Sequence, residues 1–228
     1  MRDDLRKEFN DKIWHGQQDE SRSGAGSTLA FTERLRAQLP AFLEKHGVGT
    51  FLDAPCGDWN WMASVDLGDI HYIGGDIADA VVEEVRAAHG GPNRDFILLD
   101  ITSDPLPKAD MMMARDVLFH LKFWLRWKFL ENFVASGTPL LLTTMHHIKA
   151  NKKLGKNGGF TKFNPMAAPF NFPAPIDMIH ETADDLPADI AERDEGRKHR
   201  SMGLWTREQI IAVLDARAAA KAAEEVGA

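Results

Sequence analysis

The most constraining feature of this sequence is a succession of short apolar runs in which apolar and polar residues do not alternate. The runs lie at residues 48–53, 70–76, 96–100, 110–114 and 140–146, and each is bounded by turn residues. Strands buried on both faces produce such runs, because helices cover both faces of a parallel sheet. The pattern therefore predicts an α/β fold with three layers and a mostly parallel sheet.

Segments with a helical period separate these runs. Large apolar side chains recur every three or four residues between positions 31 and 42, which predicts a helix that ends near Gly47. The same period predicts helices at 80–89 and 121–136. Helices that alternate with buried strands in this way support the α/β assignment.

The pattern changes after the fifth run. Residues 148–174 are rich in Lys, Asn, Gly, Pro and Phe and show no period, so we expect an irregular insertion on the substrate side. Residues 176–181 and 201–205 predict an antiparallel C-terminal strand pair. Thr206 and Gln209 have the spacing of a capping box, which predicts that a C-terminal helix begins there.

The length of the chain fits one domain. At 228 residues the chain is of ordinary size for a single α/β unit, which we place at 28–228. Residues 1–27 are polar and contain a Gly/Ser-rich turn, so we expect a separate N-terminal segment that is a candidate lid. Trp14 is a candidate residue of this lid.

Composition excludes several classes of protein. The 34 acidic and 27 basic residues give a net charge of −7, which argues against a whole-surface nucleic-acid binder. The one cysteine, Cys56, excludes an internal disulfide framework and a multi-cysteine zinc site. No apolar run approaches a membrane span, and the N-terminus is too charged for a signal peptide, so we expect a cytoplasmic protein without a membrane partner.

Acidic residues end the first three predicted strands. Asp53 precedes a tight turn that contains Gly57, and Asp76 and Asp100 end the next two strands. Ligands of doubly wound sheets bind outside the carboxyl ends of the strands, and an acidic residue at the end of the second strand can bind both hydroxyls of a ribose. Because glycine has no Cβ, we expect Gly57 to let the ligand approach the backbone closely.

These residues resemble those of the class I S-adenosylmethionine-dependent methyltransferases, which have a Rossmann-like fold. The resemblance covers residues 28–147, and Pro55 and Trp59 replace two of the usual glycines. The segment Arg115–Leu121 is similar to the one that lies under the methionine moiety and the methyl acceptor. The resemblance implies S-adenosylmethionine as the cofactor, held by Asp53, Ala54, Pro55, Cys56, Gly57, Asp76, Ile77, Asp100, Ile101 and Arg115.

The mechanism that the resemblance implies is a direct displacement, in which the protein aligns the acceptor with the methyl carbon. A hydroxyl acceptor also needs a general base, for which histidine is the usual choice. His120 and His146 are the catalytic candidates, with Asp116 orienting the acceptor or contacting the cofactor's ammonium group. Each could instead be a structural residue of the core. His120, His146, His147 and Asp116 are residue types that bind metals, but their spacing matches no compact metal motif, so we expect no metal.

The acceptor is the least constrained part of the prediction. Lysines without any acidic residue occupy 148–162, and aromatic residues follow, which favours a small hydroxylated or anionic acceptor such as a sugar or nucleotide-linked metabolite. Two alternatives remain open: a nucleic-acid or protein methyltransferase, and a non-catalytic protein that binds S-adenosylmethionine. The oligomeric state is not predicted. The candidate substrate residues are His147, Lys149, Phe160, Asn164, Phe170 and Phe172.

Overall fold

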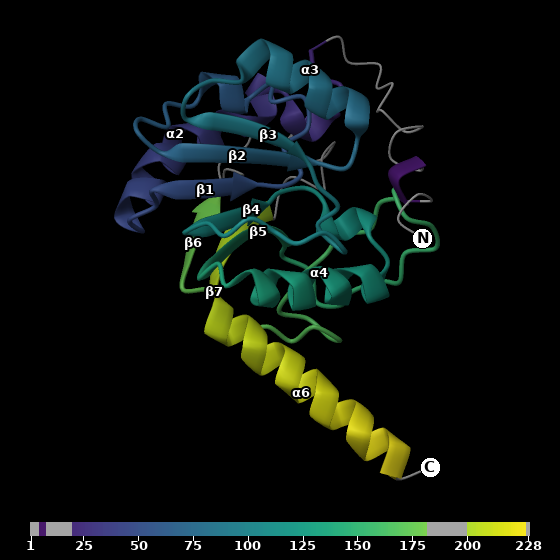
Figure 1. Cartoon of the computed structure of the whole chain (residues 1–228). Coiled ribbons are helices and arrows are strands. Elements are labelled where there is room, and N and C mark those ends of the chain that lie inside the picture. Colours follow the sequence, from purple (N-terminus) through teal and green to yellow (C-terminus); the bar gives the residue numbers. More distant parts are fainter. Residues whose placement is uncertain (1–4, 8–19, 182–199, 227–228) are drawn as a thin grey trace, which may run out of the picture.

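The fold is built on one sheet. The computed structural model describes residues 5–7, 20–181 and 200–226, and its seven strands lie in the order β3-β2-β1-β4-β5-β7-β6 (Figure 1). Neighbours from β3 to β5 are parallel, whereas β7 is antiparallel to both β5 and β6. This confirms the mostly parallel sheet with an antiparallel C-terminal pair. The strands are β1 (Thr50–Asp53), β2 (His71–Asp76), β3 (Arg94–Leu98), β4 (Met111–Ala114), β5 (Leu140–His146), β6 (Asp177–His180) and β7 (Arg200–Thr206).

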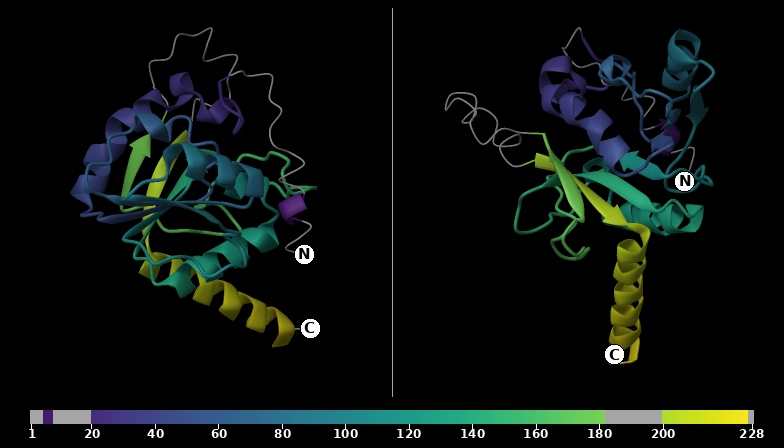
Figure 2. Two further views of the ribbon diagram at one scale, coloured as in Figure 1. Left: turned by 45° about the horizontal axis from the view of Figure 1, so that its top comes forward. Right: turned by 90° about the vertical axis from the view of Figure 1, so that its left-hand side faces the viewer.

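Helices cover both faces of the sheet, as expected for three layers. The helices α2 (Leu29–Lys45) and α3 (Asp79–His89) lie on one face, and α4 (Phe123–Ser136) and α6 (Arg207–Val226) lie on the other (Figure 2). The C-terminal part of α6 extends away from the body (Figure 1). Three short 3₁₀ helices also lie in the described part of the chain: η1 (Ala25–Ser27), η2 (Met62–Ser64) and η3 (Leu118–His120).

The strand residues explain the absence of alternation in the sequence. Leu52 and Met112 belong to the core on the α4 side, whereas Phe51 and Met113 belong to the core under α2 and α3. All four are completely buried. Successive residues of a strand point to opposite faces, so a sheet that is covered twice needs apolar residues at every position.

Several predicted boundaries were wrong by two residues. The first strand begins at Thr50 rather than at residue 48, and the third begins at Arg94 rather than at residue 96. The third strand ends at Leu98 rather than Asp100, because the Asp100 carboxylate accepts hydrogen bonds from the Thr102 N–H and hydroxyl at 2.9 and 2.7 Å and so holds a turn. The helix predicted from 121 begins at Phe123, after η3. At α6 the capping box is confirmed, since Thr206 and Gln209 exchange hydrogen bonds at 2.9 and 3.2 Å.

Residues 148–174 carry no helix or strand, as predicted, but they contribute to the core. Phe163 and Phe170 are buried, and the Phe170 ring stacks on Trp127 of α4 at 4.5 Å between centroids. Phe172 packs edge-on against Trp205 of β7. The aromatic residues of this segment therefore attach it to the α4 face of the sheet.

No helix in the described part of the chain is long and apolar enough to cross a bilayer. Trp14, which we named as a candidate lid residue, lies outside the described residues.

Candidate active site

A cavity of about 400 Å³ opens at the carboxyl ends of the parallel strands. Its walls come from the segments that follow β1, β2, β3 and β4, from the end of β5 and from the N-terminal segment around η1. This is the position that the strand order predicts for a ligand site. The predicted site residues that line it are Asp53, Pro55, Cys56, Gly57, Asp76, Ile77, Asp100, Ile101, Arg115, Asp116, His120, His146 and Phe160.

The turn after β1 is crowded, but not in the way that we expected. Gly57 has a φ of +57°, and a Cβ at this position would lie 2.3 Å from the Ser23 hydroxyl. A protein side chain therefore already makes the close approach that we had assigned to a ligand. Glycine is required here both for the backbone conformation and for the contact with Ser23.

Asp58 anchors the N-terminal segment beside this turn. Its carboxylate accepts hydrogen bonds from the Ser21 hydroxyl at 2.8 Å, the Arg22 N–H at 2.6 Å and the Ser23 hydroxyl at 2.9 Å. Residues 22–27 consequently form one wall of the cavity. The Gly/Ser-rich composition marked this stretch as a turn, but nothing in the sequence indicated that Asp58 would bind it.

Asp76 and Asp100 frame the cavity through their own turns. The Asp76 carboxylate accepts hydrogen bonds from the Ala78 N–H at 2.9 Å and the Gly57 N–H at 3.1 Å, and burial raises its pKa. The Asp100 carboxylate is bound by Thr102 and by the Ser103 hydroxyl at 2.9 Å. Both carboxylates are thus fixed in position beside the space that a ligand would occupy.

Asp53 presents a buried acceptor without a partner. Its Oδ2 accepts a hydrogen bond from the Tyr72 hydroxyl at 2.7 Å, whereas its Oδ1 has no partner among the described residues. Burial raises the pKa of Asp53 to about 7, against the opposing effects of the Tyr72 hydrogen bond and the charge of Arg115. An unsatisfied buried acceptor costs about 1–3 kcal/mol, so a donor group on a ligand at this point would be stabilised.

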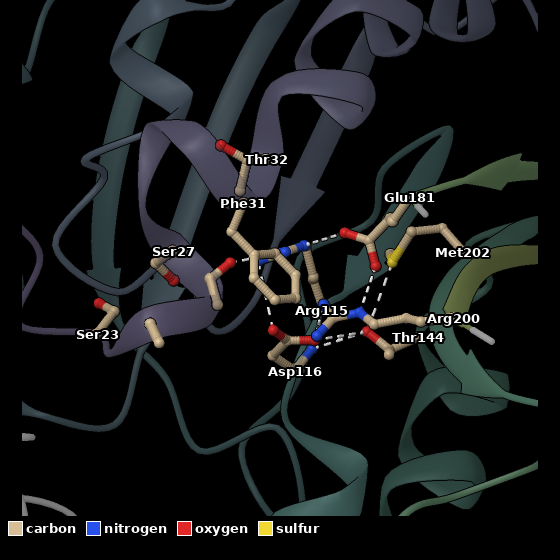
Figure 3. A network of polar contacts seen from close by, with 12 residues as sticks. Ser23, Ser27, Phe31, Thr32, Arg115, Asp116, Thr144, Glu181, Arg200 and Met202 are labelled. Carbon is tan, nitrogen blue, oxygen red and sulfur yellow. Dashed lines mark hydrogen bonds and ion pairs between the residues drawn. The ribbon is translucent and has the colours of Figure 1, made fainter. Parts of the chain in front are cut away.

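Four charged side chains form a network next to the end of β4. Arg115, Glu181 and Arg200 are buried, whereas the Asp116 side chain is 21% exposed. Arg115 Nε donates to Glu181 at 2.9 Å and its guanidinium lies 3.4 Å from Asp116, while Arg200 pairs with both carboxylates. Figure 3 shows the four side chains together, with the Phe31 ring beside them. Two positive and two negative charges balance one another here.

The network determines the role that Asp116 can have. Burial alone would raise the pKa of Asp116, but the charges of Arg115 and Arg200 outweigh it and lower the pKa to about 2. A carboxylate with so low a pKa is a poor general base at neutral pH. The roles that we predicted for Asp116, orienting the acceptor or contacting the cofactor's ammonium group, do not need it to accept a proton, and they stay predictions.

The same network holds the N-terminal wall in place. Arg115 donates to the Gly26 carbonyl at 2.8 Å, and a Cβ on Gly26 would lie 2.8 Å from Asp116 Oδ2. Both guanidinium groups lie over the Phe31 ring. Sequence analysis missed Glu181, Arg200 and Phe31, because their partners are distant in the chain.

The two histidines of the cavity have different environments. His120 Nδ1 lies 2.6 Å from the Gly159 carbonyl, to which it donates, so the neutral ring accepts protons at Nε2. His146 Nδ1 lies 3.2 Å from the Phe163 N–H and 3.3 Å from the Phe163 carbonyl, so Phe163 can bind either tautomer of the ring. Burial and the charge of Arg200 lower the pKa of His146 to about 4. His120 is therefore the better placed of the two as a proton acceptor.

Several predicted residues do not reach the cavity. His147 and Lys149 are exposed, Phe170 and Phe172 are buried in the core, and the Asn164 side chain binds the backbone of its own loop. Ala54 is buried behind the turn, and no described lysine lines the cavity. Cys56 does line it, but burial raises the pKa of its thiol well above the usual value, so it is inert. The described residues contain no group of His, Cys, Asp and Glu that could hold a metal.

Solved methyltransferase structures share this fold. A 1,6-didemethyltoxoflavin-N1-methyltransferase from Burkholderia thailandensis superposes with a TM-score of 0.59 at 15% identity, over 89% of this chain and 86% of that one. Magnesium protoporphyrin IX methyltransferase from Synechocystis gives 0.58 at 13%, over 90% and 96%. The N-methyltransferase NodS from Bradyrhizobium japonicum gives 0.58 at 11%, over 83% and 93%.

These three structures contain S-adenosylmethionine or S-adenosylhomocysteine. No protein-family model matches the sequence, and no curated protein sequence matches it significantly. The chain has the fold of the class I S-adenosylmethionine-dependent methyltransferases, as the residues after the first three strands predicted.

The buried network makes a prediction about stability. Replacing Glu181 by Gln should lower the free energy of unfolding by about 3 kcal/mol, because it leaves two buried arginines with a single carboxylate. Urea denaturation measures the change. The matched control is Lys45→Met, which removes the exposed Lys45–Asp177 pair and should cost less than about 1 kcal/mol. Equal effects of the two substitutions would contradict a structural role for the network.

Proposed function

We propose that this protein is an S-adenosylmethionine-dependent methyltransferase that acts on a small-molecule acceptor. The observation that carries the proposal is the cavity at the carboxyl ends of β1 and β2, lined by Asp53 and Asp76, in a fold whose solved relatives bind this methyl donor. Two of those relatives are described by small-molecule substrates, a porphyrin and a toxoflavin precursor. The cavity volume suits a small ligand.

The residues of the cavity fit the methyl donor. The unpaired Asp53 Oδ1 is a suitable acceptor for the donor's ammonium group. Asp76 lies where a ribose would bind, and Ile77 and Ile101 supply apolar surface for an adenine ring. When bound, the donor supplies a methyl group that its sulfonium already activates.

The protein then has two tasks at the acceptor. It must hold the acceptor oxygen or nitrogen in line with the methyl carbon, and it must remove a proton from a hydroxyl acceptor. His120 Nε2 performs the second task, and the Gly159 carbonyl keeps the ring in the required tautomer.

The first test is donor binding. Asp76→Ala should abolish the binding of S-adenosylhomocysteine in a calorimetric titration, because the substitution removes the carboxylate at the ribose position and releases the turn around Gly57. Asp95→Ala, an exposed site on β3, is the matched control and should bind as the wild type does. If the Asp76 variant binds S-adenosylhomocysteine as tightly as the wild type does, Asp76 does not bind the ribose. If the wild type does not bind S-adenosylhomocysteine, the proposed function is wrong.

Donor affinity should depend on pH through Asp53. The pKa of about 7 means that the carboxylate is protonated below this pH and ionised above it, so affinity should rise as the pH increases toward about 7. The affinity for the donor should fall by up to about tenfold for each pH unit below the pKa of Asp53. Asp53→Asn should bind weakly and without this slope in the same titrations. A wild-type affinity that stays constant over the range would contradict the role of Asp53.

Proton removal is tested by turnover. His120→Ala should lower the rate of methyl transfer by about 10²-fold or more for a hydroxyl acceptor, while the affinity for S-adenosylhomocysteine stays unchanged. His147→Ala is the matched control, since His147 is exposed and contacts Ser201 outside the cavity. Equal rates in the two variants would show that catalysis does not need the His120 ring. Donor binding without transfer to any acceptor would favour a non-catalytic binding protein.

A further inference from the structure

The cavity has an aromatic end beyond the donor residues. Phe119, His120, His146 and Phe160 line it where β4 and β5 end. The Phe119 ring lies 5.1 Å from Phe160 and 5.3 Å from His146 between centroids, in edge-to-face arrangements. Phe160 is 58% exposed, which is unusual for a phenylalanine that lines a cavity. The sheet order separates this end from Asp76 and Asp100, because β4 and β5 lie on the other side of β1.

In the lining after β4, the charged Arg115 and Asp116 are already paired within the network, so few polar side chains next to these rings in the chain remain for a ligand. Val117 and Leu121, from the segment after β4, are the apolar residues of the lining nearest in the chain to Phe119. His120 and His146 are the polar side chains of the aromatic group itself. A sugar has hydroxyls around its whole ring, each of which loses free energy if it is buried without a partner. An acceptor with few polar groups fits this lining better than a sugar does.

The charges around the cavity argue against an anionic acceptor. The described lining contains five aspartates against three arginines. Arg115 and Arg200 are paired with Asp116 and Glu181, and Arg22 is paired with Glu84. Because His146 has a pKa of about 4, it stays neutral and adds no positive charge. With Asp53 half protonated near its pKa of about 7, the aspartates still outnumber the arginines. This negative excess suits the positively charged methyl donor and opposes a second ligand with a phosphate or carboxylate.

We propose, building on the methyltransferase function above, that the acceptor is an uncharged planar ring that carries a hydroxyl group and packs against Phe160. The acceptor oxygen forms a bond to the methyl carbon as the sulfur–carbon bond of the donor breaks. The hydroxyl proton goes to His120 Nε2, and the products are a methyl ether and S-adenosylhomocysteine. The sequence favoured a small hydroxylated or anionic acceptor such as a sugar or nucleotide-linked metabolite. The present proposal keeps the hydroxyl group and omits the anionic group, since no described lysine lines the cavity.

The test compares neutral and charged ligands on the protein saturated with S-adenosylhomocysteine. Calorimetric titrations use naphthol, hydroxyquinoline and hydroxycoumarin as neutral rings, hydroxynaphthoic acid as the carboxylated counterpart, and uridine diphosphate glucose as a sugar nucleotide. Naphthol should bind at least about tenfold more tightly than hydroxynaphthoic acid. Stronger binding of the acid or of the sugar nucleotide overturns the proposal, and so does the failure of all three neutral rings to bind.

The substitution Phe160→Ala tests whether the ring of the acceptor packs against Phe160. The variant should bind naphthol about tenfold more weakly and bind S-adenosylhomocysteine as the wild type does. The matched control is Trp124→Ala on α4, which removes another exposed aromatic, 42% exposed, that does not line the cavity. Unchanged naphthol binding in the Phe160 variant overturns the proposal. The titration with S-adenosylhomocysteine alone distinguishes the methyltransferase function from the proposed acceptor. If S-adenosylhomocysteine does not bind, the methyltransferase function is contradicted; if it binds and the neutral rings do not, only the proposed acceptor is contradicted.

Discussion

Two arginines and two carboxylates pair with one another at the edge of the sheet where the cavity opens, and this pairing supports the rest of the site. Three of the four side chains are buried, and Asp116 is partly exposed. Each of these charges loses several kcal/mol of hydration on burial, so each depends on its partners. The antiparallel direction of β7 makes the pairing possible. Arg200 begins β7 and therefore lies opposite His146 at the end of β5, at the edge where β4 presents Arg115 and Asp116.

The network connects the sheet to the N-terminal segment. Arg115 binds the Gly26 carbonyl and both guanidinium groups cover Phe31, while Asp58 binds the segment from the other side. One wall of the cavity is consequently formed by residues that precede the first strand. The wall of the cavity depends on contacts between segments that are far apart in the chain. The residues at the strand ends, in contrast, are positioned by the strands that they follow.

That division explains how much the sequence could predict. The strands follow from local patterns, because burial on both faces requires apolar residues at every position, and Asp53 and Asp76 follow from the rule that ligands bind at carboxyl ends. The contact between Ser23 and Gly57 and the pairing of Glu181 with Arg115 depend on tertiary packing, which no local pattern encodes. Phe170 and Phe172 were predicted to line the substrate pocket but are buried in the core. The composition of a segment does not distinguish an aromatic residue that lines a cavity from one that packs in the core.

We propose that the methyl donor binds in the strand-end cavity between Asp76 and the N-terminal segment. A crystal structure of the protein with S-adenosylhomocysteine tests it most directly. We expect density for the ribose beside Asp76 and for the amino group within hydrogen-bonding distance of Asp53, with Phe160 next to the sulfur. Density for the ligand at any other surface, or an empty cavity at saturating ligand concentration, would contradict it.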